Sequence, residues 1–254
     1  MSRHQEYIVI FERLFTKLKE IIKDNGDQFL IVITGDLFHQ KIDISNEQQV
    51  LLKNLLNNLS DIAEVIVIAG NHDLLVNNKD RLDSITPIID AINNERVHYL
   101  KESTLYKFDN VVFANYSVFE DNRRPDIEGY KEEMGEEGDR YVGLYHAPLS
   151  GSKTEMGFGF DTSDNVQIFN GLDFVMCGDI HLHQQVKADI PVVYAGSLIQ
   201  QSFGENLSGH GFLIWNVEKA VYKHYEIPNE NTMVKIEMGS INNLENEELK
   251  VINE

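Results

Sequence analysis

Two apolar runs of strand length, separated by an amphipathic helix, constrain this chain to a fold with parallel strands. Residues 29–33 form the first run and lead into Gly35-Asp36, while residues 63–69 form the second and lead into Gly70-Asn71-His72-Asp73. Between them, apolar residues recur at helical spacing over residues 45–59, with Ser45 as the expected N-cap. A strand–helix–strand unit of this kind pairs its strands in parallel, so both polar segments are expected at one active-site edge.

Five side chains that follow apolar strands are candidate metal ligands. They are oxygen and nitrogen donors with no thiolate among them, a set that suits Mn, Fe, Zn or Mg rather than a structural zinc–thiolate site. Two such ions would share a bridging carboxylate, polarise a phosphate and generate hydroxide near neutral pH. The five candidates are Asp36, Asn71, His146, Asp179 and His181.

Asp36 and His72 can be given individual roles within this set. Asp36 is the natural bridging carboxylate between two ions. His72 directly follows Asn71, so its imidazole can reach a bound phosphate and protonate the leaving oxygen. Taken alone, a loop histidine is more often a polar surface residue, and both interpretations of His72 stay open at this point.

Composition narrows the class of protein. The 254 residues suffice for one large core or for a domain with an appendage. The formal charge is -19, from 22 Lys and Arg against 41 Asp and Glu, so any DNA substrate would need bound metal or a partner subunit to supply attraction. No apolar run is long enough to cross a bilayer and the first residues lack a secretory signal, which predicts an intracellular protein without a membrane partner.

The pattern of elements predicts an α/β (α+β) fold. An amphipathic helix is expected near residues 7–22, and after about residue 97 the pattern changes to shorter strands separated by turns. Hairpin chemistry around Asp109-Asn110 favours antiparallel pairing in this second half. The expected architecture is two sheets packed face to face with helices outside. The later strands are expected at residues 104–108, 111–115, 141–145, 174–176, 191–194 and 211–215.

The order of these motifs resembles that of the calcineurin-like metallophosphoesterases. Within that superfamily, residues 35–39, 78–84 and 194–205 are similar to the SbcD-type DNA-repair nucleases, especially the forms of large viruses and phages. The resemblance covers roughly residues 3–217. It implies a four-layer α-β-β-α sandwich of two mixed sheets, with a nuclease domain over residues 1–222 and, over residues 223–254, a tail or the truncated start of a capping domain.

The resemblance also implies a role for each candidate residue. Asp36 would bridge two divalent ions, Mn in the first place and Mg as the second choice, and His181 would serve one of the two sites. His72 would steady the transition state, while His39 would either face the phosphate or be an ordinary loop residue. Gly196 and Ser197 would shape a nearby loop. The ligands that would complete the other metal site are Asn71, His146 and Asp179.

Three departures from the family pattern affect these roles. The family begins with a strand ending in Asp-x-His, which supplies two ligands to the His181 site, and this sequence starts just after that point. Its absence would expose strand edges and invite pairing with another chain. Asp179 stands where the family has the first histidine of Gly-His-x-His, which adds negative charge and favours harder ions such as Mn or Mg. Little of the second, DNA-capping domain remains before Glu254.

The leading functional hypothesis is a metal-dependent hydrolase, a phosphodiesterase or exonuclease that cleaves DNA ends in repair or recombination by activated-water attack on the backbone phosphate. It would work with an SbcC-type coiled-coil ATPase, with a homodimer as a further expectation. It would act in the cytoplasm or nucleus of a host, in a viral factory or in a virion. The alternatives are a phosphatase or small-molecule phosphodiesterase of the same superfamily and a non-catalytic binding subunit with an incomplete metal site.

Overall fold

The computed structural model describes most of the chain. The described residues are 2–25, 28–40, 43–120, 123–234, 236–237 and 250–251. Part of the tail that was predicted over 223–254 therefore lies outside the described residues, namely 235, 238–249 and 252–254.

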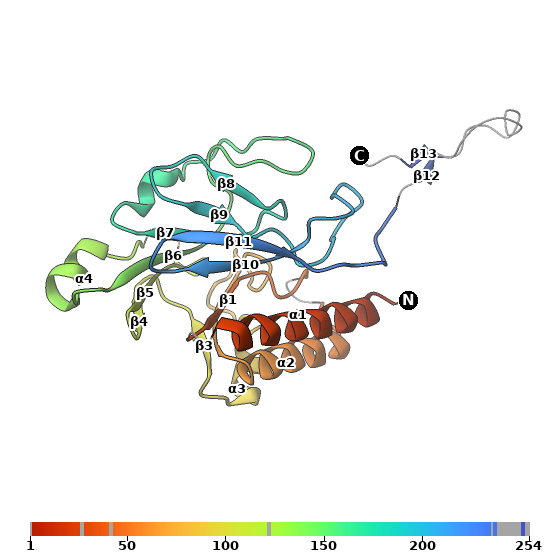
Figure 1. Cartoon of the computed structure of the whole chain (residues 1–254), viewed down its shortest axis with the longest axis horizontal. Helices are drawn as coiled ribbons and strands as arrows, with labels where there is room; N and C mark the ends of the chain where they lie inside the picture. The colour runs from red at the N-terminus through yellow and green to blue at the C-terminus, as the bar shows by residue number, and fades with distance from the viewer. Residues whose placement is uncertain are drawn as a thin grey trace, which may run out of the picture.

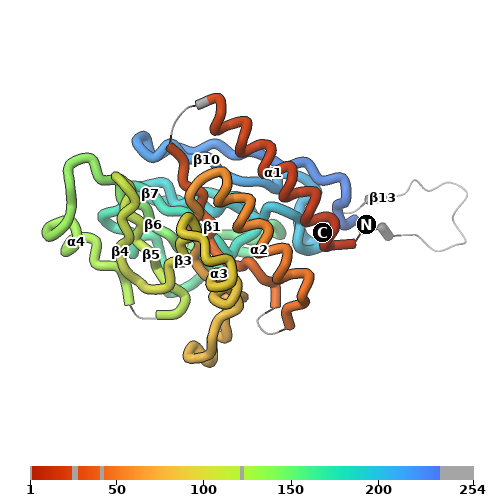
Figure 2. Tube along the Cα trace, turned by 90° about the horizontal axis from the view of Figure 1, so that it is seen from below, coloured from red at the N-terminus to blue at the C-terminus, as the bar shows by residue number. Residues whose placement is uncertain are grey.

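Three helices form one outer layer of the molecule, seen together below the strands in Figure 1 and facing the viewer in Figure 2. They are α1 (Arg3–Asn25), α2 (Asn46–Ser60) and α3 (Thr86–Ile92). The predicted N-cap of α2 is confirmed, since the Ser45 side chain accepts from the Gln48 amide and the Gln48 side chain accepts from the Ser45 amide. The apolar residues that recur at helical spacing over residues 45–59 are expected to face the core, and Val50 is an exception, since it is 55% exposed.

The helices cover a parallel sheet of three strands, β1 (Leu30–Thr34), β2 (Glu64–Ile68) and β3 (Val97–Leu100), in that order. The parallel β1–β2 pair confirms the strand–helix–strand prediction. All five residues of β1 are only half-buried, whereas four of the five in β2 are buried. A continuous apolar run such as residues 29–33 predicts a strand covered on both faces, and β1 falls short of this because it lies at the edge of its sheet.

A second sheet has six strands in the order β4-β5-β6-β7-β9-β8. Antiparallel pairing, predicted for this half, occurs in this sheet between β4 and β5 and between β8 and β9, and residues 211–226 form a further antiparallel hairpin outside it. The pairs β5–β6, β6–β7 and β7–β9 are parallel. Connections that include helices α4 (Ile127–Met134) and η1 (Val166–Phe169) carry the chain back in the first two pairs, and strand β8 does so in the third. The strands are β4 (Leu105–Phe108), β5 (Val111–Tyr116), β6 (Arg140–His146), β7 (Phe174–Gly178), β8 (Gln184–Val186) and β9 (Val192–Tyr194).

The two sheets pack face to face, which confirms the predicted sandwich. Ile66 and Ile68 of the first sheet share one buried cluster with Phe113, Leu144 and Phe174 of the second. On the far side, the six-stranded sheet packs against a cluster that includes residues of η1 and of the loops around it. The carboxyl ends of the parallel strands of both sheets are thereby held close together.

A hairpin of β10 (Gly211–Asn216) and β11 (Val221–Glu226) extends the layer of the first sheet. Figures 1 and 2 place β10 beside β1, and Phe212 packs in the helix-side cluster while Trp215 packs in the cluster between the sheets. No hydrogen-bonded ladder joins β1 to β10 among the described strands. Strand β11 runs across residue 222, the expected domain boundary, and β12 (Ile236–Glu237) pairs with β13 (Lys250–Val251) beyond it.

Candidate metal centre

The ends of four strands bring the candidate ligands to one place. Asp36 and Asn71 follow β1 and β2, His146 is the last residue of β6, and Asp179 directly follows β7. Because these strands are parallel within two sheets packed face to face, their ends meet across the sandwich. One ligand atom from each of Asp36, His146 and Asp179 lies within 4.8 Å of the others, a group that can hold a metal ion.

His146 is oriented to present a free lone pair to this group. Its Nδ1 lies 2.5 Å from the carbonyl oxygen of Thr34, so Nδ1 carries the proton and donates it there. The opposite nitrogen, Nε2, lies 3.2 Å from Asp36 Oδ1 and 3.7 Å from Asp179 Oδ1. It is buried and has no hydrogen-bond partner among the described residues. A lone pair that faces two carboxylates is the arrangement that a cation satisfies.

Asn71 supplies a second orphaned acceptor. Its Nδ2 donates to Asp179 Oδ1 over 3.4 Å, while its Oδ1 is buried without a hydrogen-bond partner in the described part of the chain. An unpaired buried acceptor costs free energy unless an ion or ordered water contacts it. With only oxygen and nitrogen donors present, the site fits a divalent cation such as Mn or Mg better than a structural zinc.

The electrostatics of the metal-free site reflect the crowding of its carboxylates. Burial alone would raise the pKa of Asp36, but His146 and the amide of His72 outweigh it and the pKa is lowered. Burial raises the pKa of Asp179, which His146 offsets only in part while the neighbouring Asp36 charge adds to the rise. A bound cation would stabilise both carboxylates in their charged form.

Glycines and left-handed backbone allow this close approach. Gly35, Asp36 and Asp179 adopt φ values of 94°, 54° and 83°. A Cβ atom on Gly70 would collide with Asp36 Oδ1, and one on Gly178 would collide with the carbonyl oxygen of Thr34. Positive φ at two non-glycine residues is strained backbone, and here both strained residues are candidate ligands.

Asp73 ties the two ligand-bearing loops together. Its carboxylate is fully buried and accepts from the amide of Gly70 over 2.8 Å and from the amide of Phe38 over 3.0 Å. Burial raises its pKa to about 7. The sequence pattern assigns no role to Asp73, because its partner Phe38 lies in a different loop and the contact arises only in the folded chain.

His72 and His39 lie together beside Asp36. The amide of His72 donates to Asp36 Oδ1 over 3.0 Å, and its ring Nδ1 lies 2.6 Å from the carbonyl oxygen of His39. The two imidazole rings stack with centroids 5.6 Å apart and an angle of 11° between them. The proton that His72 donates to His39 leaves Nε2 as the ring atom available to a substrate.

His181 stands apart from the other ligands. It is not in the three-residue group around Asp36, and its Nδ1 instead lies 2.9 Å from Glu205 Oε1. The amide of Ser197 donates to the His181 carbonyl over 2.9 Å, so the loop at residues 196–197 packs against the His181 segment. Glu205 belongs to a motif noted in the sequence, but no role was assigned to it.

Comparison with known proteins decides the family. The model of the calcineurin-like phosphoesterase family matches residues 8–183. The chain belongs to this family. Calcineurin-like phosphoesterases are hydrolases that typically depend on divalent metals, which agrees with the group of Asp36, His146 and Asp179.

A viral relative extends the match beyond the family segment. The chain is 38% identical over 235 residues to uncharacterized protein R555 of Acanthamoeba polyphaga mimivirus. The aligned segment covers 91% of this phosphoesterase chain but only 17% of the viral protein, so the chain spans about a sixth of that relative's length. In the described part of the chain, no helix combines the length and apolar character needed to cross a membrane.

Proposed function

We propose that this chain is the phosphoesterase domain of a metal-dependent nuclease that hydrolyses phosphodiester bonds at DNA ends. The observation that carries the proposal is the buried, unpaired His146 Nε2 beside the Asp36 and Asp179 carboxylates. Asn71, whose Nδ2 donates to Asp179, adds a second buried acceptor, Oδ1, that is unpaired in the described structure. The segments at residues 35–39, 78–84 and 194–205 favour a nuclease of SbcD type within the family.

The residues of the site divide the work between holding cations and moving a proton. Asp36, Asn71, His146 and Asp179 would hold one divalent cation, with Mn preferred, and His181 with Asp36 would serve a second. Such cations would supply Lewis acidity for activation of the attacking water. The Nδ1 of His72 contacts the carbonyl oxygen of His39, which holds the ring and leaves Nε2 available, so the His72 imidazolium would protonate the leaving oxygen.

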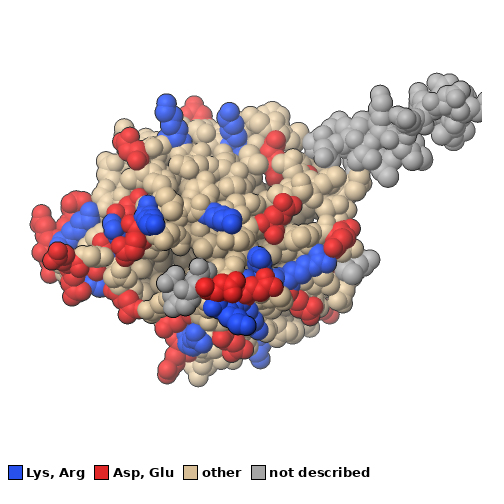
Figure 3. All heavy atoms as spheres, viewed as in Figure 1, with Lys and Arg blue, Asp and Glu red and all other residues tan. Residues whose placement is uncertain are grey.

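Because the surface is acidic, binding of a DNA substrate requires positive charge from outside the chain. On the face in Figure 3, Lys and Arg side chains are interspersed with Asp and Glu, which gather at the end that carries α4. The formal charge of -19 opposes binding of a polyanion. We propose that bound cations and an SbcC-type ATPase partner supply the attraction. The viral relative supports an intracellular site of action, in host cytoplasm or nucleus, a viral factory or a virion.

A non-catalytic binding subunit is the second candidate. The ring of His181 contacts Glu205 and lies outside the group formed by Asp36, His146 and Asp179, so the second cation has few ligands among the described residues. The edge of β1 has no hydrogen-bonded partner in the described structure, so such a subunit could pair a strand of a partner chain there. A phosphatase or small-molecule phosphodiesterase remains the alternative within the family.

The deciding experiment is cleavage of end-labelled duplex and single-stranded DNA in Mn, in Mg and in EDTA. We expect Mn-dependent cleavage that disappears in Asp36→Asn together with Mn binding, and in His72→Ala without loss of Mn binding. Hydrolysis of a cyclic nucleotide with none of DNA would replace the nuclease by a small-molecule phosphodiesterase. Bound Mn with no hydrolysis of either substrate would favour the binding subunit.

A further inference from the structure

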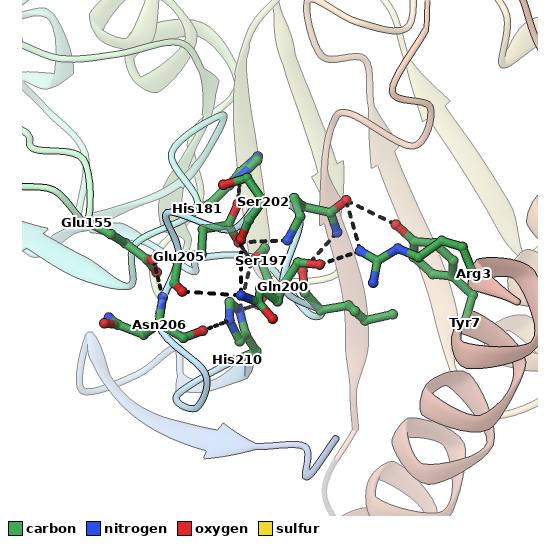
Figure 4. A network of polar contacts seen from close by, with 12 residues as sticks. Arg3, Tyr7, Glu155, His181, Ser197, Gln200, Ser202, Glu205, Asn206 and His210 are labelled. Atoms are coloured by element: carbon green, nitrogen blue, oxygen red, sulfur yellow. Dashed lines mark hydrogen bonds and ion pairs between the residues drawn. The ribbon is translucent and has the colours of Figure 1, made fainter. Parts of the chain in front are cut away.

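Glu205 is a buried carboxylate that directly contacts His181. It lies in the loop between β9 and β10, is 6% exposed, and its Oε1 lies 2.9 Å from His181 Nδ1 (Figure 4). An ionised group at this depth is costly unless it is paired and hydrogen-bonded. The burial of Glu205 is therefore better explained by its hydrogen-bond partners than by packing alone.

Three donors hold the Glu205 carboxylate in one orientation. Besides His181, the amide of Gln201 donates to Oε2 over 2.8 Å, and the hydroxyl of Ser197 donates to Oε2 over 3.4 Å. These three contacts hold the Glu205 carboxylate against the imidazole of His181.

The loop that carries Glu205 is anchored at both sides. The buried Gln200 side chain donates to the Glu205 carbonyl over 3.3 Å and accepts from the amide of Met233 over 2.7 Å. From α1, Arg3 donates to the Gln200 carbonyl and Tyr7 donates to Gln201 Oε1 (Figure 4). A rigid support of this kind is what a residue needs in order to orient a neighbour.

The contact selects one form of the His181 ring. A carboxylate accepts but cannot donate, so in the neutral His181 ring Nδ1 carries the proton and Nε2 presents its lone pair. The His181 side chain is 44% exposed, so without the Glu205 contact it could populate both neutral tautomers and several rotamers. His146 is oriented in the same sense, although its Nδ1 faces the neutral carbonyl of Thr34 rather than a charged group.

We infer that Glu205 is a positioning residue, which fixes the tautomer and orientation of His181 so that Nε2 serves as a metal ligand. The inference rests on the proposed function in one respect, the assignment of His181 to the second cation. A carboxylate that accepts the Nδ1 proton also makes Nε2 a stronger electron-pair donor to a metal ion. Loss of such a hydrogen-bond partner of a metal ligand changes metal affinity by about 10- to 100-fold.

The first test is independent of metal and of activity. Long-range ¹H–¹⁵N NMR of the metal-free protein, at alkaline pH where the imidazole is neutral, reports which ring nitrogen of His181 carries the proton. We expect Nδ1–H in the wild type and in Glu205→Gln, whose amide oxygen still accepts, and a mixture of tautomers in Glu205→Ala. Glu155→Gln is the matched control, because Glu155 contacts the Asn206 amide in the same network. An unchanged His181 tautomer in Glu205→Ala would overturn the inference.

The second test measures Mn binding by calorimetry. Glu205→Ala should weaken the second ion by about 10- to 100-fold while leaving the ion at Asp36 and His146 in place, and Glu205→Gln should restore most of the affinity. If Glu205→Ala does not fold, Glu205→Leu decides, because its side chain of similar size can neither accept nor donate, and an unchanged His181 tautomer there would equally overturn the inference. Equal Mn affinity in the wild type and in His181→Ala would instead refute the role of His181 in the proposed function. The NMR result on the His181 tautomer would be unaffected.

Discussion

At the scale of single residues, the site is defined by atoms that lack partners. His146 Nε2 and Asn71 Oδ1 are buried acceptors without hydrogen bonds among the described residues, and His146 Nε2 lies near the carboxylates of Asp36 and Asp179. Buried acceptors left unpaired beside two carboxylates are unfavourable in a metal-free protein. This arrangement makes metal binding the property that is most directly testable.

His146→Ala removes the ligand with the best-defined orientation. We expect the affinity for Mn at the Asp36 site to fall by more than the roughly 10- to 100-fold typical of losing an outer partner. Isothermal titration calorimetry measures it. His98→Ala is the control, because His98 lies in β3 and pairs with Glu64 over 3.0 Å, outside the site. Unchanged Mn affinity in His146→Ala would remove this residue from the metal centre.

Asp73 predicts how the stability of the metal-free protein depends on pH. Its pKa is raised by burial from 3.8 to about 7 in the folded state, so between these values the folded protein binds more protons than the unfolded chain. The free energy of unfolding should therefore fall as pH rises through this window. Urea denaturation in EDTA at several pH values measures the slope.

Asp73→Asn should remove the part of the pH dependence that comes from Asp73. The control variant, Asp24→Asn at an exposed position of α1, should leave the slope unchanged. The comparison with the wild type cancels the titration of Asp36 and Asp179, which remain in both proteins. A slope that is identical in wild type and Asp73→Asn would show that Asp73 is ionised throughout the window.

At the scale of elements, the close approach of the two sheets decides where the ligands lie. Gly178 ends β7, and a Cβ atom there would collide with the carbonyl of Thr34 at the end of β1. That carbonyl also accepts from His146 Nδ1, so the contact between β1 and β7 affects the orientation of a candidate metal ligand as well as the packing of the sheets.

Gly178→Ala should push β7 away from β1, with a loss of stability of about 1–3 kcal/mol typical of overpacking and a marked loss of Mn affinity. Gly159→Ala is the matched control, because its Cβ would have no neighbour closer than 3.9 Å. Thermal unfolding and calorimetry on both variants measure the two effects. Wild-type Mn binding by Gly178→Ala would mean that the sheets move without disturbing the ligands.

At the scale of the whole molecule, net charge predicts how DNA binding depends on metal. With a formal charge of -19, the chain should bind duplex DNA in EDTA more weakly than the roughly 10⁻⁴–10⁻⁶ M of ordinary non-specific binders at physiological salt. Mn should strengthen binding in the wild type and not in Asp36→Asn. Fluorescence anisotropy of a labelled duplex measures this, and tight binding in EDTA would contradict it.

Features that depend on near neighbours in the chain could be predicted from local patterns. They include the Ser45 cap of α2, the strand-length runs of β1 and β2, and the polar residues at their ends, of which Asp36 comes together with His146 and Asp179 as a group. The parallel order of β5, β6, β7 and β9, the half-buried state of β1 and the contact of Glu205 with His181 could be seen only in the folded chain. These features depend on which distant segments lie side by side, and that is set by packing over the whole molecule rather than by local periodicity.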